Sequence, residues 1–100
     1  MWSPLQVVMA VVCIPVVEEL VFRELLQSML TAVLPAWMAV VITATARALL
    51  ADDVDDATLS MMESITFGTV YALTDTVLVP VAMHVAWNAA AVYALRAPYY

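Results

Sequence analysis

The chain has 100 residues, of which 66% are hydrophobic and 12% are charged, and its mean hydropathy is +0.99. A soluble domain of this length could not hide so much apolar surface, since small domains bury the smallest share of their chain. The formal net charge is −6 and the only cations are three arginines, which excludes nucleic-acid binding because phosphate neutralisation needs a basic surface. We therefore expect an integral membrane protein that has the lipid bilayer as its solvent.

The first apolar segment is predicted to be a helix over about residues 5–34, which is long enough to span a bilayer. Long runs of Ala, Leu, Val and Met favour helices, and helices satisfy their own backbone hydrogen bonds in lipid. Pro15 is predicted to kink or break this helix, because proline removes a backbone hydrogen bond and clashes with the carbonyl four residues back.

Three further apolar segments follow, over residues 36–50, 59–74 and 77–95. Residues 51–56 contain four aspartates, which predict a solvated loop between helices. A calcium loop is disfavoured because the stretch lacks the glycine and the final glutamate that such loops use. The predicted fold is an all-α integral membrane bundle of about four hydrophobic helical segments.

Four charged side chains, Glu18, Glu19, Arg23 and Glu24, interrupt the first apolar segment. A charge at membrane depth costs at least about 2.5–3.5 kcal/mol, so such residues usually face a bundle interior and suggest function. On a helix, Glu19 and Arg23 are four residues apart and can pair, whereas Glu18 points about 100° away from Glu19. We therefore expect Glu18 to be an unpaired carboxylate that can act as a general base. The alternative is an ion cluster at a helix end near the lipid headgroups.

The one histidine of the chain, His84, lies in the last segment, four residues before Asn88. Both side chains lie on one helix face, about 40° apart, so both can address the same point in space. Together with Glu18 they would form a hydrolytic site. Glu18 would take a proton from water, His84 would orient that water or protonate a leaving group, and Asn88 would donate to a developing oxyanion. The alternative, which stays open, is that His84 and Asn88 only form hydrogen bonds between helices.

The pattern Glu18-Glu19-x-x-x-Arg23, followed late in the chain by His84-x-x-x-Asn88, resembles the CPBP family of intramembrane proteases. That family includes CAAX prenyl endopeptidases and bacteriocin-processing or immunity proteins. The resemblance implies that Glu18 activates water, with Glu19 as its partner carboxylate. It also implies that Arg23 holds the site together, and that His84 and Asn88 help to bind water and to stabilise the oxyanion.

The chain departs from the family at a middle motif, in which a second catalytic histidine follows an aromatic or apolar residue by four positions. This chain has only one histidine. The motif corresponds either to Phe67-x-x-x-Tyr71, with Tyr in place of His, or to residues 44–50. In the second stretch the histidine would fall near Ala48, Leu49 or Leu50, and none of these side chains can act as a ligand.

The resemblance also raises the question of a divalent metal such as zinc, for which Glu18 and His84 are the candidate ligands. Catalytic zinc usually takes three protein ligands, mostly His, Glu or Cys. One histidine with two glutamates is a poor set, so the sequence favours a glutamate-activated water over bound zinc.

These observations predict a single domain over residues 1–100, or the C-terminal core of a larger helical bundle, in a multi-pass protein of the cell membrane. Its expected function is that of an intramembrane endopeptidase that hydrolyses a peptide or prenylated peptide. The alternative is a catalytically inactive relative that acts as a binding or immunity partner. A third hypothesis is a proton or ion conductor, in which Glu18, Glu19 and His84 relay charge.

Overall fold

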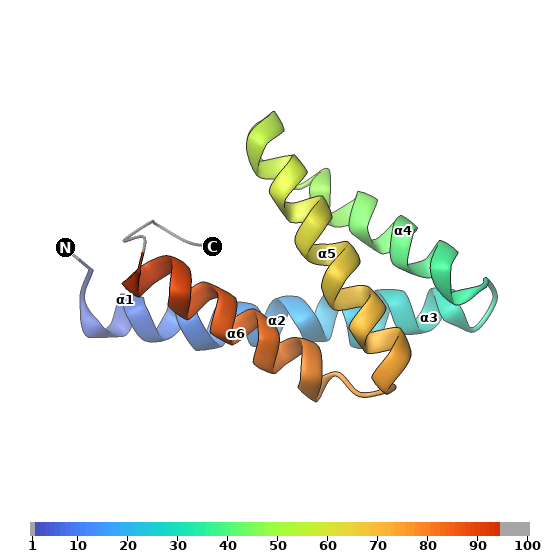
Figure 1. The fold of residues 1–100 in the computed structure, drawn as a ribbon, viewed down its shortest axis with the longest axis horizontal. Coiled ribbons are helices and arrows are strands. Elements are labelled where there is room, and N and C mark those ends of the chain that lie inside the picture. Colours follow the sequence, from blue (N-terminus) through green and yellow to red (C-terminus); the bar gives the residue numbers. More distant parts are fainter. Residues whose placement is uncertain (1, 95–100) are drawn as a thin grey trace.

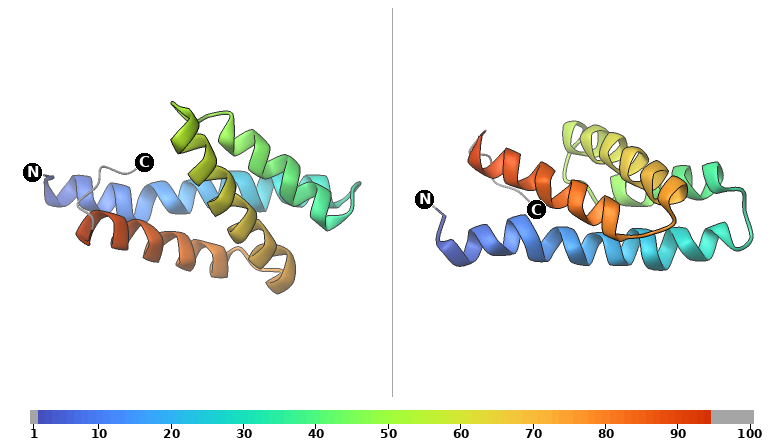
Figure 2. Two further views of the ribbon diagram at one scale, coloured as in Figure 1. Left: turned by 45° about the horizontal axis from the view of Figure 1, so that its top comes forward. Right: turned by 60° about the horizontal axis from the view of Figure 1, so that its bottom comes forward.

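The computed structural model describes residues 2–94, and in that range it consists of helices joined by short turns, with no strand. One long helix forms one layer (Figure 1), and three helices pack against one side of it, as the right-hand view of Figure 2 shows. The all-α prediction is therefore confirmed. The long helix, called the first helix below, runs from Pro4 to Thr31 and is divided into α1 (Pro4–Val8), η1 (Met9–Cys13), α2 (Ile14–Glu19), η2 (Leu20–Gln27) and α3 (Ser28–Thr31). The second layer consists of α4 (Ala36–Ala48), α5 (Val54–Thr74) and α6 (Leu78–Tyr93).

The first helix has the length and composition of a membrane span. It has 28 residues, and its most apolar window has a mean hydropathy of 2.1. It begins with a capping box, in which the Ser3 hydroxyl accepts from the Gln6 amide and the Gln6 side chain accepts from the Ser3 amide. Pro4 occupies the first turn, where its missing N–H costs no hydrogen bond. Among the described residues it is the one helix that is long and apolar enough to cross a bilayer, while α4 and α6 are shorter apolar helices.

The predicted break at Pro15 is wrong, because the helix continues through it. Met9–Cys13 adopts π-helical geometry instead, and the Ile14 N–H bonds to the Met9 carbonyl five residues back. This register leaves the Ala10 carbonyl without its usual donor, Ile14, and Pro15 has no N–H to offer in its place. The Asn88 side chain of α6 donates to that carbonyl at 2.9 Å. The carbonyl that loses its donor beside the proline in the first helix is therefore satisfied by a side chain of α6.

The boundaries of the other helices match the predictions closely, except at the start of α5. This helix begins at Val54, five residues before the predicted start, because Asp53 caps it by accepting from the Asp56 amide at 2.7 Å. Asp55 and Asp56 lie in its first turn, where negative charge is favourable to the helix dipole. Part of the predicted acidic loop is thus helical. Residue 95, the predicted end of the last helix, lies outside the described residues.

Many of the buried side chains are polar, and apolar side chains cover much of the surface. Large apolar residues along the first helix are exposed, among them Leu5, Val17 and Leu25. This distribution differs from that of a soluble domain and fits a protein surrounded by lipid, where polar groups face the bundle interior. The buried polar residues are Glu19, Arg23, Gln27, Thr43, Ser60, Ser64, His84 and Asn88.

Hydrogen bonds from the first helix to carbonyls of α5 fix how these two helices cross. Arg23 Nη2 donates to the Ser64 carbonyl at 3.2 Å, and Gln27 Nε2 donates to the Gly68 carbonyl at 3.0 Å. The two donors are one turn apart on the first helix and the two acceptors are one turn apart on α5, so the two bonds join successive turns of both helices. Gly68 permits this approach, because a Cβ there would lie 2.8 Å from the Gln27 side-chain oxygen.

We predict that Asn88→Ala lowers the free energy of unfolding by about 1–3 kcal/mol, since it leaves the buried Ala10 carbonyl without a donor. Pro15→Ala supplies an N–H and allows ordinary α-helical bonding, which gives Ala10 its Ile14 donor. The cost of Asn88→Ala is therefore expected to fall in the Pro15→Ala background. Denaturant unfolding in detergent micelles of the parent, both single variants and the double variant measures this coupling. Equal costs in the two backgrounds would contradict the explanation.

Candidate active site

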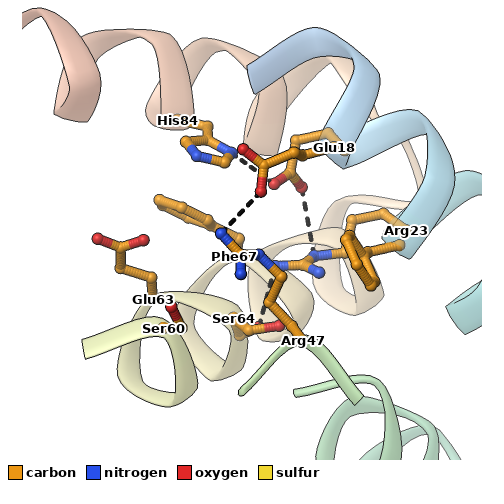
Figure 3. Close-up of a pocket in the computed structure, with 10 residues that line it drawn as sticks. Glu18, Arg23, Arg47, Ser60, Glu63, Ser64, Phe67 and His84 are labelled. Atoms are coloured by element: carbon orange, nitrogen blue, oxygen red, sulfur yellow. Dashed lines mark hydrogen bonds and ion pairs between the residues drawn. The ribbon is translucent and has the colours of Figure 1, made fainter. Parts of the chain in front are cut away.

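Four segments of the chain meet around a small cavity at the middle of the first helix (Figure 3). Its volume is about 10 Å³, which is the space that one water molecule needs. Side chains from the first helix, from the end of α4, from α5 and from the start of α6 line it. The lining residues are Glu18, Glu19, Phe22, Arg23, Arg47, Ser60, Glu63, Ser64, Phe67 and His84.

Glu19 is the central group of this cluster and is only 2% exposed. Its Oε1 lies 3.3 Å from Arg23 Nε, which confirms the pairing predicted from their spacing. Its Oε2 lies 2.7 Å from His84 Nδ1 on α6. Arg23 also bonds to the Ser64 carbonyl, so this carboxylate joins the first helix to α6 directly and to α5 through Arg23.

His84 is held on two sides. Its Nδ1 contacts Glu19, and its ring stacks on Phe67 of α5 with centroids 5.0 Å apart and an interplanar angle of 30°. An ionised carboxylate only accepts hydrogen bonds, so we assign the proton of the neutral ring to Nδ1. The Nε2 lone pair is then available to a molecule in the cavity.

Glu18 is not the unpaired carboxylate that the sequence suggested. Its Oε2 lies 2.8 Å from Arg47 Nη2, a residue near the end of α4. Its Oε1 is buried and has no hydrogen-bond partner among the described residues. One oxygen is therefore neutralised by a cation, and the other is buried without a donor in a side chain that lines the water-sized cavity.

Asn88 does not line the cavity, so the expectation that it addresses the same point as His84 is wrong. Its side chain is fully buried and donates to the Ala10 carbonyl, one turn away from His84 along α6. This is the interhelical bond that the sequence left open as the alternative for both residues. The structure brings together the other predicted site residues, which are Glu18, Glu19, Arg23 and His84.

Arg47 is a cavity-lining cation that sequence reasoning missed. It lies within residues 44–50, where the family's middle histidine was sought, and it is the residue of that stretch that lines the cavity. Leu49 and Leu50 are 79% and 67% exposed, and Ala48 is half-buried without lining the cavity. A lone cation in an apolar segment was the available signal. The other candidate, Tyr71, donates to Glu24 at 3.1 Å and lines a different pocket.

The residues around the cavity do not fit a catalytic zinc ion, which usually takes three protein ligands. The two candidate ligands were Glu18 and His84. Glu18 already contacts Arg47, and with Nδ1 of His84 bound to Glu19 the ring offers only Nε2, so the two candidates provide fewer than three ligands. Within residues 2–94, no group of three or more His, Cys, Asp or Glu side chains is placed to hold a metal ion.

Comparison with known proteins agrees with the geometry. The family model described as type II CAAX prenyl endopeptidase Rce1-like matches residues 1–90. No curated protein and no solved structure matches the chain. The family match covers most of the chain, including every residue that lines the cavity. The chain therefore belongs to the Rce1-like family of type II CAAX prenyl endopeptidases, a family of membrane-embedded proteases.

Proposed function

We propose that residues 1–100 form a single intramembrane endopeptidase domain of a multi-pass protein of the cell membrane, which hydrolyses a peptide or prenylated peptide. The observation that carries the proposal is that Glu18, whose Oε1 is buried without a hydrogen-bond partner among the described residues, lines a water-sized cavity together with His84. A carboxylate and an imidazole next to one water position are the groups that hydrolysis by general-base catalysis needs.

Glu18 is the general base of the proposed reaction. Its Oε1 takes a proton from the water as the water oxygen bonds to the scissile carbonyl carbon. The tetrahedral intermediate then collapses, the C–N bond breaks, and the leaving nitrogen takes the proton that Glu18 received. Cleavage yields a new carboxyl group and an amine, and Glu18 returns to its ionised form.

His84 orients the water through Nε2, and Glu19 positions His84. A carboxylate that bonds to one ring nitrogen fixes the tautomer and the direction of the other. Arg23 supports this arrangement by neutralising Glu19 and binding to α5. Asn88 is proposed as a positioning residue, because its bond to Ala10 holds α6, and with it His84, at a defined level of the first helix.

A neighbouring apolar pocket supports a substrate that carries an apolar group. It has a volume of about 170 Å³ and adjoins the cavity, since Glu63 and Phe67 line both. The remaining lining residues are Leu59, Met62, Thr66 and Trp87, so a lipid-like chain could lie here between α5 and α6. A peptide bond attached to such a group would lie next to the proposed water.

Glu18→Gln is expected to lower kcat by about 10²-fold or more, because an amide cannot accept the proton of water. His84→Ala is also expected to reduce cleavage strongly. The assay is hydrolysis of a farnesylated peptide ending in a CAAX sequence by the protein in liposomes. Glu24→Gln is the matched control, since Glu24 is on the same helix outside the cavity and should leave the rate unchanged. Cleavage that survives both Glu18→Gln and His84→Ala would refute the proposal.

Glu19→Gln is expected to reduce both stability and kcat. It leaves the buried Arg23 without an anion, and loss of one partner of a buried ion pair costs about 3–5 kcal/mol. It also allows His84 to adopt the other tautomer, which directs an N–H instead of a lone pair at the water. Unfolding in detergent measures the first effect and liposome kinetics the second. A variant with unchanged melting and unchanged kcat would show that Glu19 has neither role.

The second candidate function is that of a non-hydrolytic relative that binds a membrane peptide. The observation in its favour is the contact between Arg47 and Glu18, together with the absence of a second histidine. In that case the protein in liposomes would bind the farnesylated peptide, and prolonged incubation would yield no cleaved product.

A further inference from the structure

The side chain of Arg47 crosses from the end of α4 to the cavity wall. Its Nη2 lies 2.8 Å from Glu18 Oε2, and the guanidinium carbon lies 5.9 Å from the centre of the Phe22 ring. Figure 3 shows it beside Glu18, on the cavity side of α4. Two contacts of different kinds, an ion pair and a cation–π contact, therefore position this side chain.

Two arginine–glutamate pairs lie next to each other here, and they differ in exposure. The side chains of Arg23 and Glu19 are 3% and 2% exposed, and Arg23 also bonds to the Ser64 carbonyl. The side chains of Arg47 and Glu18 are 17% and 16% exposed. The Arg23 pair is thus enclosed and suited to a structural role. The Arg47 pair is the one that a molecule in the cavity can reach.

Of the two arginines at the cavity, Arg47 is the one that can contact a new anion there. The carboxylates of Glu18, Glu19 and Glu63 line it, and the arginines there are Arg23 and Arg47. Arg23 already contacts Glu19 and α5. A guanidinium has five N–H donors, so one contact with Glu18 leaves Arg47 with donors for another acceptor.

We propose that Arg47 is a further catalytic residue of this site, which supplies the positive charge that stabilises the oxyanion of the tetrahedral intermediate. The inference rests on the proposed function. Before reaction Arg47 faces the ionised Glu18. When Glu18 takes the proton of water, the negative charge passes through the new C–O bond to the former carbonyl oxygen, and Arg47 faces that anion instead. Such a preoriented donor is typically worth about 10²–10³-fold in rate.

The proposed role also fits the place of Arg47 in the stretch where the family's middle histidine was sought. This role needs a positive charge and no proton exchange. Arginine stays protonated at all relevant pH values, so it cannot share the base role of Glu18. It can supply charge. When the C–N bond breaks and the leaving nitrogen takes the proton from Glu18, the carboxylate is ionised again and its contact with Arg47 is restored.

The test compares Arg47→Met, Arg47→Lys and Arg47→His with the parent in the liposome assay with the farnesylated peptide. Arg47→Met removes the charge and is expected to lower kcat by about 10²-fold or more with little change in KM. Arg47→Lys restores a cation and is expected to recover a large part of that loss. Arg47→His is expected to gain activity relative to the parent as the pH falls below about 6.5, where imidazole becomes charged. Melting in detergent shows which variants are folded.

Three other results would overturn the inference. If Arg47→Met matches or exceeds the parent in kcat, the arginine restrains Glu18 instead of assisting it. If Arg47→Met and Arg47→Lys lose activity equally and the relative rate of Arg47→His does not depend on pH, the side chain has only a structural role. If the parent itself cleaves nothing, the proposed function fails, and this inference fails with it.

Discussion

The structure depends on a single buried carboxylate, that of Glu19. It contacts Arg23 on its own helix and His84 on the last helix, and Arg23 continues the chain of contacts to α5. Burying any one of these groups alone in apolar surroundings would cost much free energy, so they are buried only in association. The same association holds three helices together. The same contacts orient the imidazole toward the cavity.

Sequence reasoning could predict what depends on local spacing. Apolar runs gave the number of helices and their approximate ends, and the four-residue separation of Glu19 and Arg23 gave their ion pair. Charge in an apolar segment correctly marked the first helix as a place where charged side chains gather inside the bundle, because polar residues in a lipid-facing chain must turn inward. The one helix start that was missed, at Val54, depends on a capping aspartate within a stretch that read as a loop.

Contacts between distant segments could not be predicted in the same way. Helical periodicity places Glu18 on a different face from Glu19, but it does not say which helix covers that face, and the answer is the end of α4 with Arg47. For His84 and Asn88 periodicity suggested a common target, whereas the first helix is long enough to offer each its own partner, Glu19 and the Ala10 carbonyl. Both outcomes are decided by helix packing.

The π-helical turn before Pro15 has a consequence for the register between the first helix and α6. In a regular helix every interior carbonyl accepts a backbone hydrogen bond, so these carbonyls do not favour one axial position of a neighbouring helix over another. Here a single carbonyl lacks its backbone donor, and Asn88 recognises it. The proline thus fixes the position of the imidazole along the first helix, so that the two helices keep one register and any displacement moves them together instead of shifting one against the other.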